Sequence, residues 1–171
     1  MYALLKMFVD LCLLRAEPQN LPYSQFLMIF CIGCYFFLGF AVSIQEQGFG
    51  LAIISAGADT GLVAGLAVLG LWIRDSIPRA VQTITALTGT GALFELIGWP
   101  LVTFLQQLEK GETSNLSLVL LALVIWNITV IGNILRHSLE VPMWVGTGIA
   151  LLYIYTSLRV MAALYVAGGV T

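Results

Sequence analysis

Charged residues are scarce in this chain. Only 9% of its 171 residues are Asp, Glu, Lys or Arg, compared with about a quarter in an ordinary soluble domain. With one histidine and three cysteines, the sequence offers no ligand set that predicts a metal site. The net charge of -2 arises from too few residues to form a basic face, so we expect no nucleic-acid partner.

Hydrophobic residues are abundant instead. They make up 60% of the chain, which predicts an integral membrane protein surrounded by the lipid bilayer. Five apolar stretches approach or exceed the ~20 helical residues that cross a bilayer. We therefore predict an all-α, polytopic bundle in a single membrane domain over residues 1–171, with no room for a second, soluble domain. The predicted transmembrane helices are 23–44, 51–73, 80–105, 116–135 and 141–167.

The positive charges predict an orientation. Cytoplasmic loops of membrane proteins are enriched in Lys and Arg. One predicted side has only Lys110, whereas the other has five basic residues, so we expect the N-terminus in the cytoplasm and the C-terminus in the periplasm of a bacterial inner membrane. This orientation requires a chain reversal at 136–140. The five basic residues are Lys6, Arg15, Arg74, Arg79 and Arg136.

Residues 1–16 are too few to span a bilayer. Leu4, Leu5, Phe8 and Leu11 recur at helical spacing, whereas Lys6 falls elsewhere, which is an amphipathic pattern. We predict a helix that lies on the cytoplasmic membrane surface.

Ionisable residues within the apolar stretches are the strongest functional signal. Asp59, Glu95 and Arg159 each lie roughly 12 to 15 Å from the outer edge at the helical rise of 1.5 Å per residue, and Asn127 lies at a similar depth. A charge in lipid costs at least ~2.5 to 3.5 kcal/mol, so such residues pair, contact water or serve a function. We predict an intramembrane polar cluster in which Arg159 pairs with a carboxylate.

Helical phase assigns the predicted inward faces. Gly57, Gly61 and Gly65 recur every four residues, which predicts close packing against another helix and a central position for 51–73. Small and polar residues share one face in each of two other helices. They are Thr85, Thr88, Gly91, Ala92, Glu95 and Gly98 in one, and Gly148, Tyr155, Arg159 and Ala162 in the other.

Two further features lie in the apolar stretches. Pro100 cannot donate a hydrogen bond to the carbonyl of Leu96, so we expect a kink beyond Glu95. Cys31 and Cys34 have the spacing of redox motifs, but an apolar helix disfavours the thiolate that such chemistry needs. We interpret both cysteines as packing residues.

The overall layout resembles a known family. Residues 15–22, Arg-Ala-Glu-Pro-Gln-Asn-Leu-Pro, precede five closely spaced helices, and 82–100 contains a Thr-Gly-Thr-Gly-Ala run before Pro100. This arrangement resembles the small Yip-type, Rab-interacting membrane proteins and their bacterial relatives. The resemblance implies a non-enzymatic role in organising membranes or complexes and implies no site residues.

We therefore expect a non-catalytic subunit or assembly scaffold that docks to other integral membrane proteins, with no catalytic residues and no cofactor. The alternative is a small transporter or proton-conducting subunit that uses Asp59, Glu95 and Arg159. A membrane thiol oxidoreductase that uses Cys31 and Cys34 is a third, more distant alternative.

Overall fold

The computed structural model describes residues 2–45, 48–107 and 114–167, and these residues form helices without any strand. Five of the helices are long and apolar enough to cross a membrane, as the hydropathy pattern predicts. The elements in order are α1 (Tyr2–Cys12), η1 (Pro18–Asn20), α2 (Gln25–Ser43), α3 (Phe49–Ile73), η2 (Ile77–Arg79), α4 (Ala80–Gln107), α5 (Ser114–Leu139) and α6 (Met143–Ala167).

Local sequence signals explain two helix boundaries. The Ser24 hydroxyl accepts a hydrogen bond from the Leu27 N–H and caps α2. The predicted reversal at 136–140 falls at the end of that range, because α5 continues through Leu139. The chain turns only at Glu140, which has a positive φ of 53°, and at Pro142, which cannot donate to a continuing helix.

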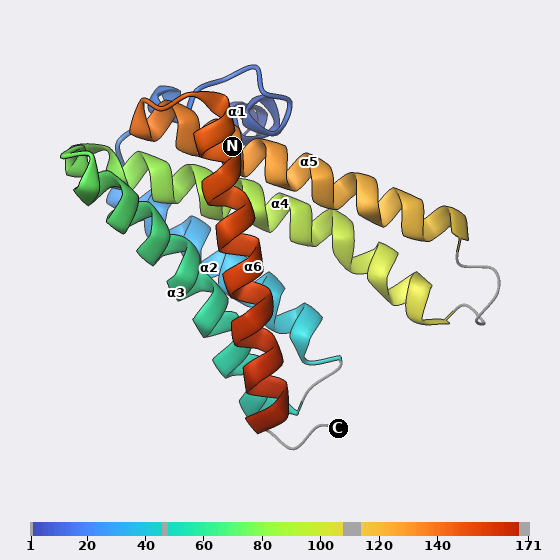
Figure 1. Ribbon diagram of the computed structural model, residues 1–171. Coiled ribbons are helices and arrows are strands. Elements are labelled where there is room, and N and C mark those ends of the chain that lie inside the picture. The colour runs from blue at the N-terminus through green and yellow to red at the C-terminus, as the bar shows by residue number, and fades with distance from the viewer. Residues whose placement is uncertain (1, 46–47, 108–113, 168–171) are drawn as a thin grey trace.

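The helices diverge from one end of the molecule. In Figure 1, α1, η2 and the turn between α5 and α6 lie together at one end, which we name the α1 end. From there, α4 and α5 run in one direction, while α3 and α6 run in another. The α2 helix stays packed along α4, as the contacts of Gly39 with Glu95 and of Gln45 with Thr103 show. The helices therefore separate toward the opposite end, which we name the far end.

The core is concentrated toward the α1 end, around α4. Residues 83–90 are all buried, so this part of α4 has neighbours on every side. Its threonine hydroxyls donate to carbonyls one turn earlier in the same helix, as Thr88 does to Ile84 over 2.8 Å. These hydrogen bonds satisfy the hydroxyl groups within the apolar core. A larger share of α4 than of the second span, α3, is buried, although α3 packs against α2, α4, α5 and α6.

The close glycine packing occurs between α5 and α6. A Cβ placed on Gly146 would overlap the backbone carbonyl oxygen of Gly132, so only glycine permits this approach.

The predicted packing of Gly57, Gly61 and Gly65 is wrong. These glycines are exposed, and Gly61 and Gly65 have open space beside them. The opposite face of α3 is buried instead, because its alanine, valine and leucine side chains fill the core. That face comprises Ala52, Ser55, Ala56, Thr60, Val63, Ala67 and Leu71.

The first helix packs on the bundle through one face. Phe8, Leu11 and Cys12 are buried, whereas Leu5 is 55% exposed. The indole N–H of Trp126 on α5 donates a 2.8 Å hydrogen bond to the Cys12 carbonyl. This helix ends at Cys12, earlier than the predicted 1–16 segment, and Leu14 then adopts a positive φ of 60°.

Candidate functional site

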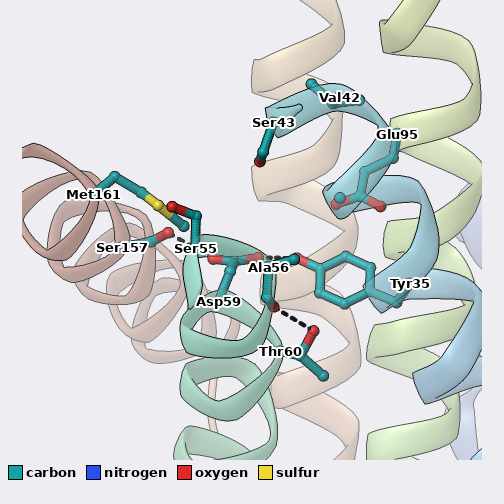
Figure 2. Close-up of a pocket in the computed structure, with 11 residues that line it drawn as sticks. Tyr35, Val42, Ser43, Ser55, Ala56, Asp59, Thr60, Glu95, Ser157 and Met161 are labelled. Carbon is teal, nitrogen blue, oxygen red and sulfur yellow. Dashed lines mark hydrogen bonds between the residues drawn. The ribbon is translucent and has the colours of Figure 1, made fainter. Parts of the chain in front are cut away.

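Asp59 lies at the centre of a hydroxyl network. The Tyr35 hydroxyl of α2 donates to its Oδ2 atom. The Tyr153 hydroxyl of α6 donates to Oδ1 over 3.0 Å, and the Ser157 hydroxyl donates to the same atom over 2.6 Å. Figure 2 shows Tyr35 reaching from α2 to Asp59. Through these hydrogen bonds, one side chain joins three helices, α2, α3 and α6.

Glu95 has a different environment. Its Oε2 atom is buried and has no hydrogen-bond partner in the structure. Its other oxygen lies against Gly39, where an added Cβ would be only 3.2 Å from Oε1. Gly39 therefore provides the space that the Glu95 carboxyl occupies. A buried carboxylate without a partner is unfavourable, so this group requires a proton, a cation or a hydrogen-bond donor.

Both acids line one cavity of about 240 Å³. Tyr35, Asp59, Glu95 and Ser157 lie near the middle of their respective helices, which places the site well inside the apolar part of the molecule. No described residue in the lining is cationic. The lining residues are Tyr35, Gly39, Val42, Ser43, Ser55, Ala56, Asp59, Thr60, Glu95, Ser157 and Met161.

A second cavity of about 330 Å³ lies between α4, α5 and α6. It shares Glu95 and Ser157 with the first cavity, and it also contains Asn127. Most of its remaining walls are apolar. They are formed by Phe94, Leu120, Leu123, Val124, Ile154 and Leu158.

Arg159 does not join the cluster. It is exposed on α6, and no ion pair between described residues connects it to Asp59 or Glu95. The predicted pairing is therefore wrong. The predicted inward face of this helix is also wrong, since Tyr155 is 61% exposed. The helix turns Tyr153 and Ser157 inward, where they bond to Asp59.

The other predicted features lie outside this network. Pro100 lies within α4, which remains helical to Gln107. Cys31 and Cys34 are free thiols, with Cys31 buried and Cys34 half-buried. Over the described ranges, no group of three or more His, Cys, Asp or Glu residues could hold a metal ion. Lys110, which entered the orientation argument, lies outside the described residues.

Sequence reasoning missed the hydroxyl donors of the site. Tyr35, Tyr153 and Ser157 each lie in an apolar helix where tyrosine and serine are ordinary residues. The available signal was spacing, because Tyr153 and Ser157 are four residues apart and share a helical face. Without the position of Asp59, that pair could not be distinguished from other polar pairs of the same helix.

No protein-family model, curated protein or solved structure matches this chain. The function must therefore be argued from the geometry of the site.

Proposed function

We propose that this protein is a small transporter or proton-conducting subunit that uses Asp59 and Glu95 as an ionisable intramembrane site. The observation that carries the proposal is the buried Oε2 atom of Glu95, which has no partner although a second acid lines the same cavity. Acids retained inside apolar helices are typical of ion and proton pathways.

The chemistry of the two acids is complementary. Asp59 accepts three hydroxyl hydrogen bonds, whereas Glu95 has no donor for its buried oxygen. Burial without a positive partner favours the neutral form of a carboxyl group. Glu95 is thus suited to take up and release one proton, or to exchange that proton for a cation.

The shape of the bundle suggests the direction of access. Toward the α1 end, buried side chains such as Leu71, Ile134 and Leu135 fill the interior. Toward the far end, the first cavity extends to Ser43 at the end of α2 and to Met161 in α6. The site is therefore suited to receive its ligand from the far end.

Reconstituted vesicles test this function. Glu95→Gln should abolish proton flux, measured with a trapped pH-sensitive dye, because the amide cannot carry an exchangeable charge. Arg159→Gln is the matched control, since Arg159 is exposed and unpaired with either acid, and its flux should equal that of the parent protein. Unchanged flux in a folded Glu95→Gln protein would rule out this site.

Docking to another membrane protein is the second candidate, in keeping with the Yip-type resemblance. The exposed glycines at Gly57, Gly61 and Gly65 favour it, because they would let a helix of an integral membrane partner approach α3 closely. Gly61→Leu should then release a stoichiometric partner during purification in mild detergent. Recovery of the parent protein without any partner would argue against docking.

The orientation in a bacterial inner membrane belongs to the same proposal. Arg74, Arg79 and Arg136 lie at helix ends or turns at the α1 end, which supports a cytoplasmic location for that end. The exposed apolar residues of α1, including Leu4 and Leu5, would then rest in the cytoplasmic interface. The test is an enzyme reporter that is active only in the periplasm, fused to the C-terminus. We expect this fusion to be active, and activity of a fused reporter that works only in the cytoplasm would reverse the assignment.

A further inference from the structure

The second cavity combines apolar walls with one acidic end. Glu95 lines both cavities, and its carboxyl packs against Gly39 of α2 on the side of the first cavity. On the side of the second cavity, Leu123, Val124 and Leu158 provide apolar surface. Pockets that bind organic ligands commonly have this composition, with apolar walls and a few polar groups that orient the ligand.

We propose that the second cavity binds the apolar part of an amphiphilic organic cation, whose ammonium group is neutralised by Glu95. This inference rests on the proposed function, because it assigns a ligand class to the same acid. Exchange at the site is balanced in charge: the carboxyl releases one proton as the cation binds, and it takes up one proton as the cation leaves.

The charges around the cavity favour a cation over a neutral or anionic ligand. The only ionisable acid in its lining is Glu95, and no described lining residue is positively charged. Asn127 and Tyr153 provide neutral polar groups beside it. An ammonium group would supply the missing partner of the buried Glu95 oxygen, whereas an anion would be repelled.

The same geometry argues for an organic cation rather than a bare metal ion. Asp59 lines only the first cavity, where its oxygens accept three hydroxyl hydrogen bonds, so it adds no ligand to the second cavity. Apart from Glu95, only Asn127, Tyr153 and Ser157 of the described lining would offer side-chain oxygens to an ion. An alkylammonium ion instead gains hydrophobic burial from the apolar walls.

Protons should compete with the organic cation at Glu95. The ionisable groups that share its cavities are Asp59 of α3, Tyr35 of α2 and Tyr153 of α6. All three are joined in one hydrogen-bond network. Of the two acids, only Glu95 has a buried oxygen without a partner, so lowering the pH should weaken cation binding mainly by protonating Glu95.

Equilibrium dialysis with the full chain in nanodiscs tests this inference, with empty nanodiscs as the blank. The probe is radiolabelled hexyltrimethylammonium, compared with tetramethylammonium, which lacks the chain, and hexanol, which lacks the charge. We expect saturable binding of the first probe only. Glu95→Gln should weaken it by at least about tenfold, because a buried charge pair loses one partner. Glu95→Asp should retain measurable binding, which separates loss of charge from loss of fold.

A second pair of variants tests where the hexyl chain of the probe binds. Leu123→Phe narrows the second cavity and should weaken binding of hexyltrimethylammonium, whereas Leu121→Phe is the control because Leu121 is 55% exposed on the same helix. Equal binding by the Leu123→Phe protein, or equal affinities for hexyltrimethylammonium and tetramethylammonium, would overturn the inference. Proton flux that requires Glu95 without any binding of the probe would overturn this inference alone and leave the proposed function standing.

Discussion

The hydroxyl of Tyr153 lies 3.0 Å from Oδ1 of Asp59, so α6 and α3 are joined by a hydrogen bond to a carboxylate. The same hydroxyl lies 3.2 Å from that of Tyr35, which brings α2 into the network. The α3 and α6 helices diverge from α4 and α5 toward the far end, whereas α2 stays packed along α4. Polar contacts to Asp59 therefore help to hold α3 and α6 against α2.

Tyr153→Phe should destabilise the protein by about 1 to 3 kcal/mol, because it removes a hydrogen bond to the half-buried carboxyl of Asp59. The expected change is a lower thermal unfolding midpoint in detergent, measured by the fluorescence of the native tryptophans. Tyr155→Phe is the control on the same helix, since Tyr155 is 61% exposed, and its midpoint should match that of the parent protein. Equal midpoints for both variants would show that the hydroxyl bond contributes little.

Gly146→Ala and Gly61→Ala should have opposite effects on stability. An alanine Cβ at 146 would overlap the Gly132 carbonyl and force α5 and α6 apart, at a cost of about 1 to 3 kcal/mol. At Gly61 nothing lies within 4 Å, so alanine should be neutral or stabilise the helix by up to about 1 kcal/mol. Thermal unfolding of the two variants side by side measures the difference. Tolerance of alanine at 146 would contradict the close approach of these helices.

Arg159→Gln should change stability by less than about 0.5 kcal/mol, because Arg159 is exposed and bonded to neither acid. The same unfolding assay measures this change. A large loss of stability would instead indicate that Arg159 forms an ion pair with an acid. The indication would be stronger if neutralising Glu95 suppressed the loss.

Cys12 should react slowly with iodoacetamide at neutral pH. Burial raises the pKa of its thiol to about 11, so the reactive thiolate is a small minority at pH 8. Because the thiolate fraction rises with pH below the pKa, labelling should accelerate about tenfold per pH unit between pH 8 and 10. Mass spectrometry of a Cys31→Ser, Cys34→Ser protein measures the rate. Rapid labelling at pH 7 would indicate that α1 does not stay packed on α4 and α5.

Hydropathy and depth could be read from the sequence because they depend on residues close together in the chain. The five apolar helices follow from their composition and length, and Asp59, Glu95 and Asn127 could be placed at similar depths by counting residues. The structure places Asp59 and Glu95 in one cavity, and Glu95 and Asn127 in the next. The predicted small-residue face of α4 also contains residues that the structure buries, such as Thr85 and Thr88.

Helix rotation and helix partners could not be read in the same way. Gly57, Gly61 and Gly65 have the pattern of a packing face, but the pattern does not specify which helix will pack there. The close contact instead forms between Gly132 and Gly146, which lie in helices joined by a short turn.

The sequence alone determined that the chain is a multi-pass helical membrane protein with acids at mid-depth, because transfer into an apolar medium acts on each segment separately. The tertiary structure decided that Ser157 faces Asp59 while Arg159, two residues later, faces outward. Successive residues of a helix point about 100° apart, so these two positions lie on opposite sides and only one can face the acid. That choice depends on neighbouring helices, since the network with Tyr35 and Tyr153 exists only when α2, α3 and α6 come together.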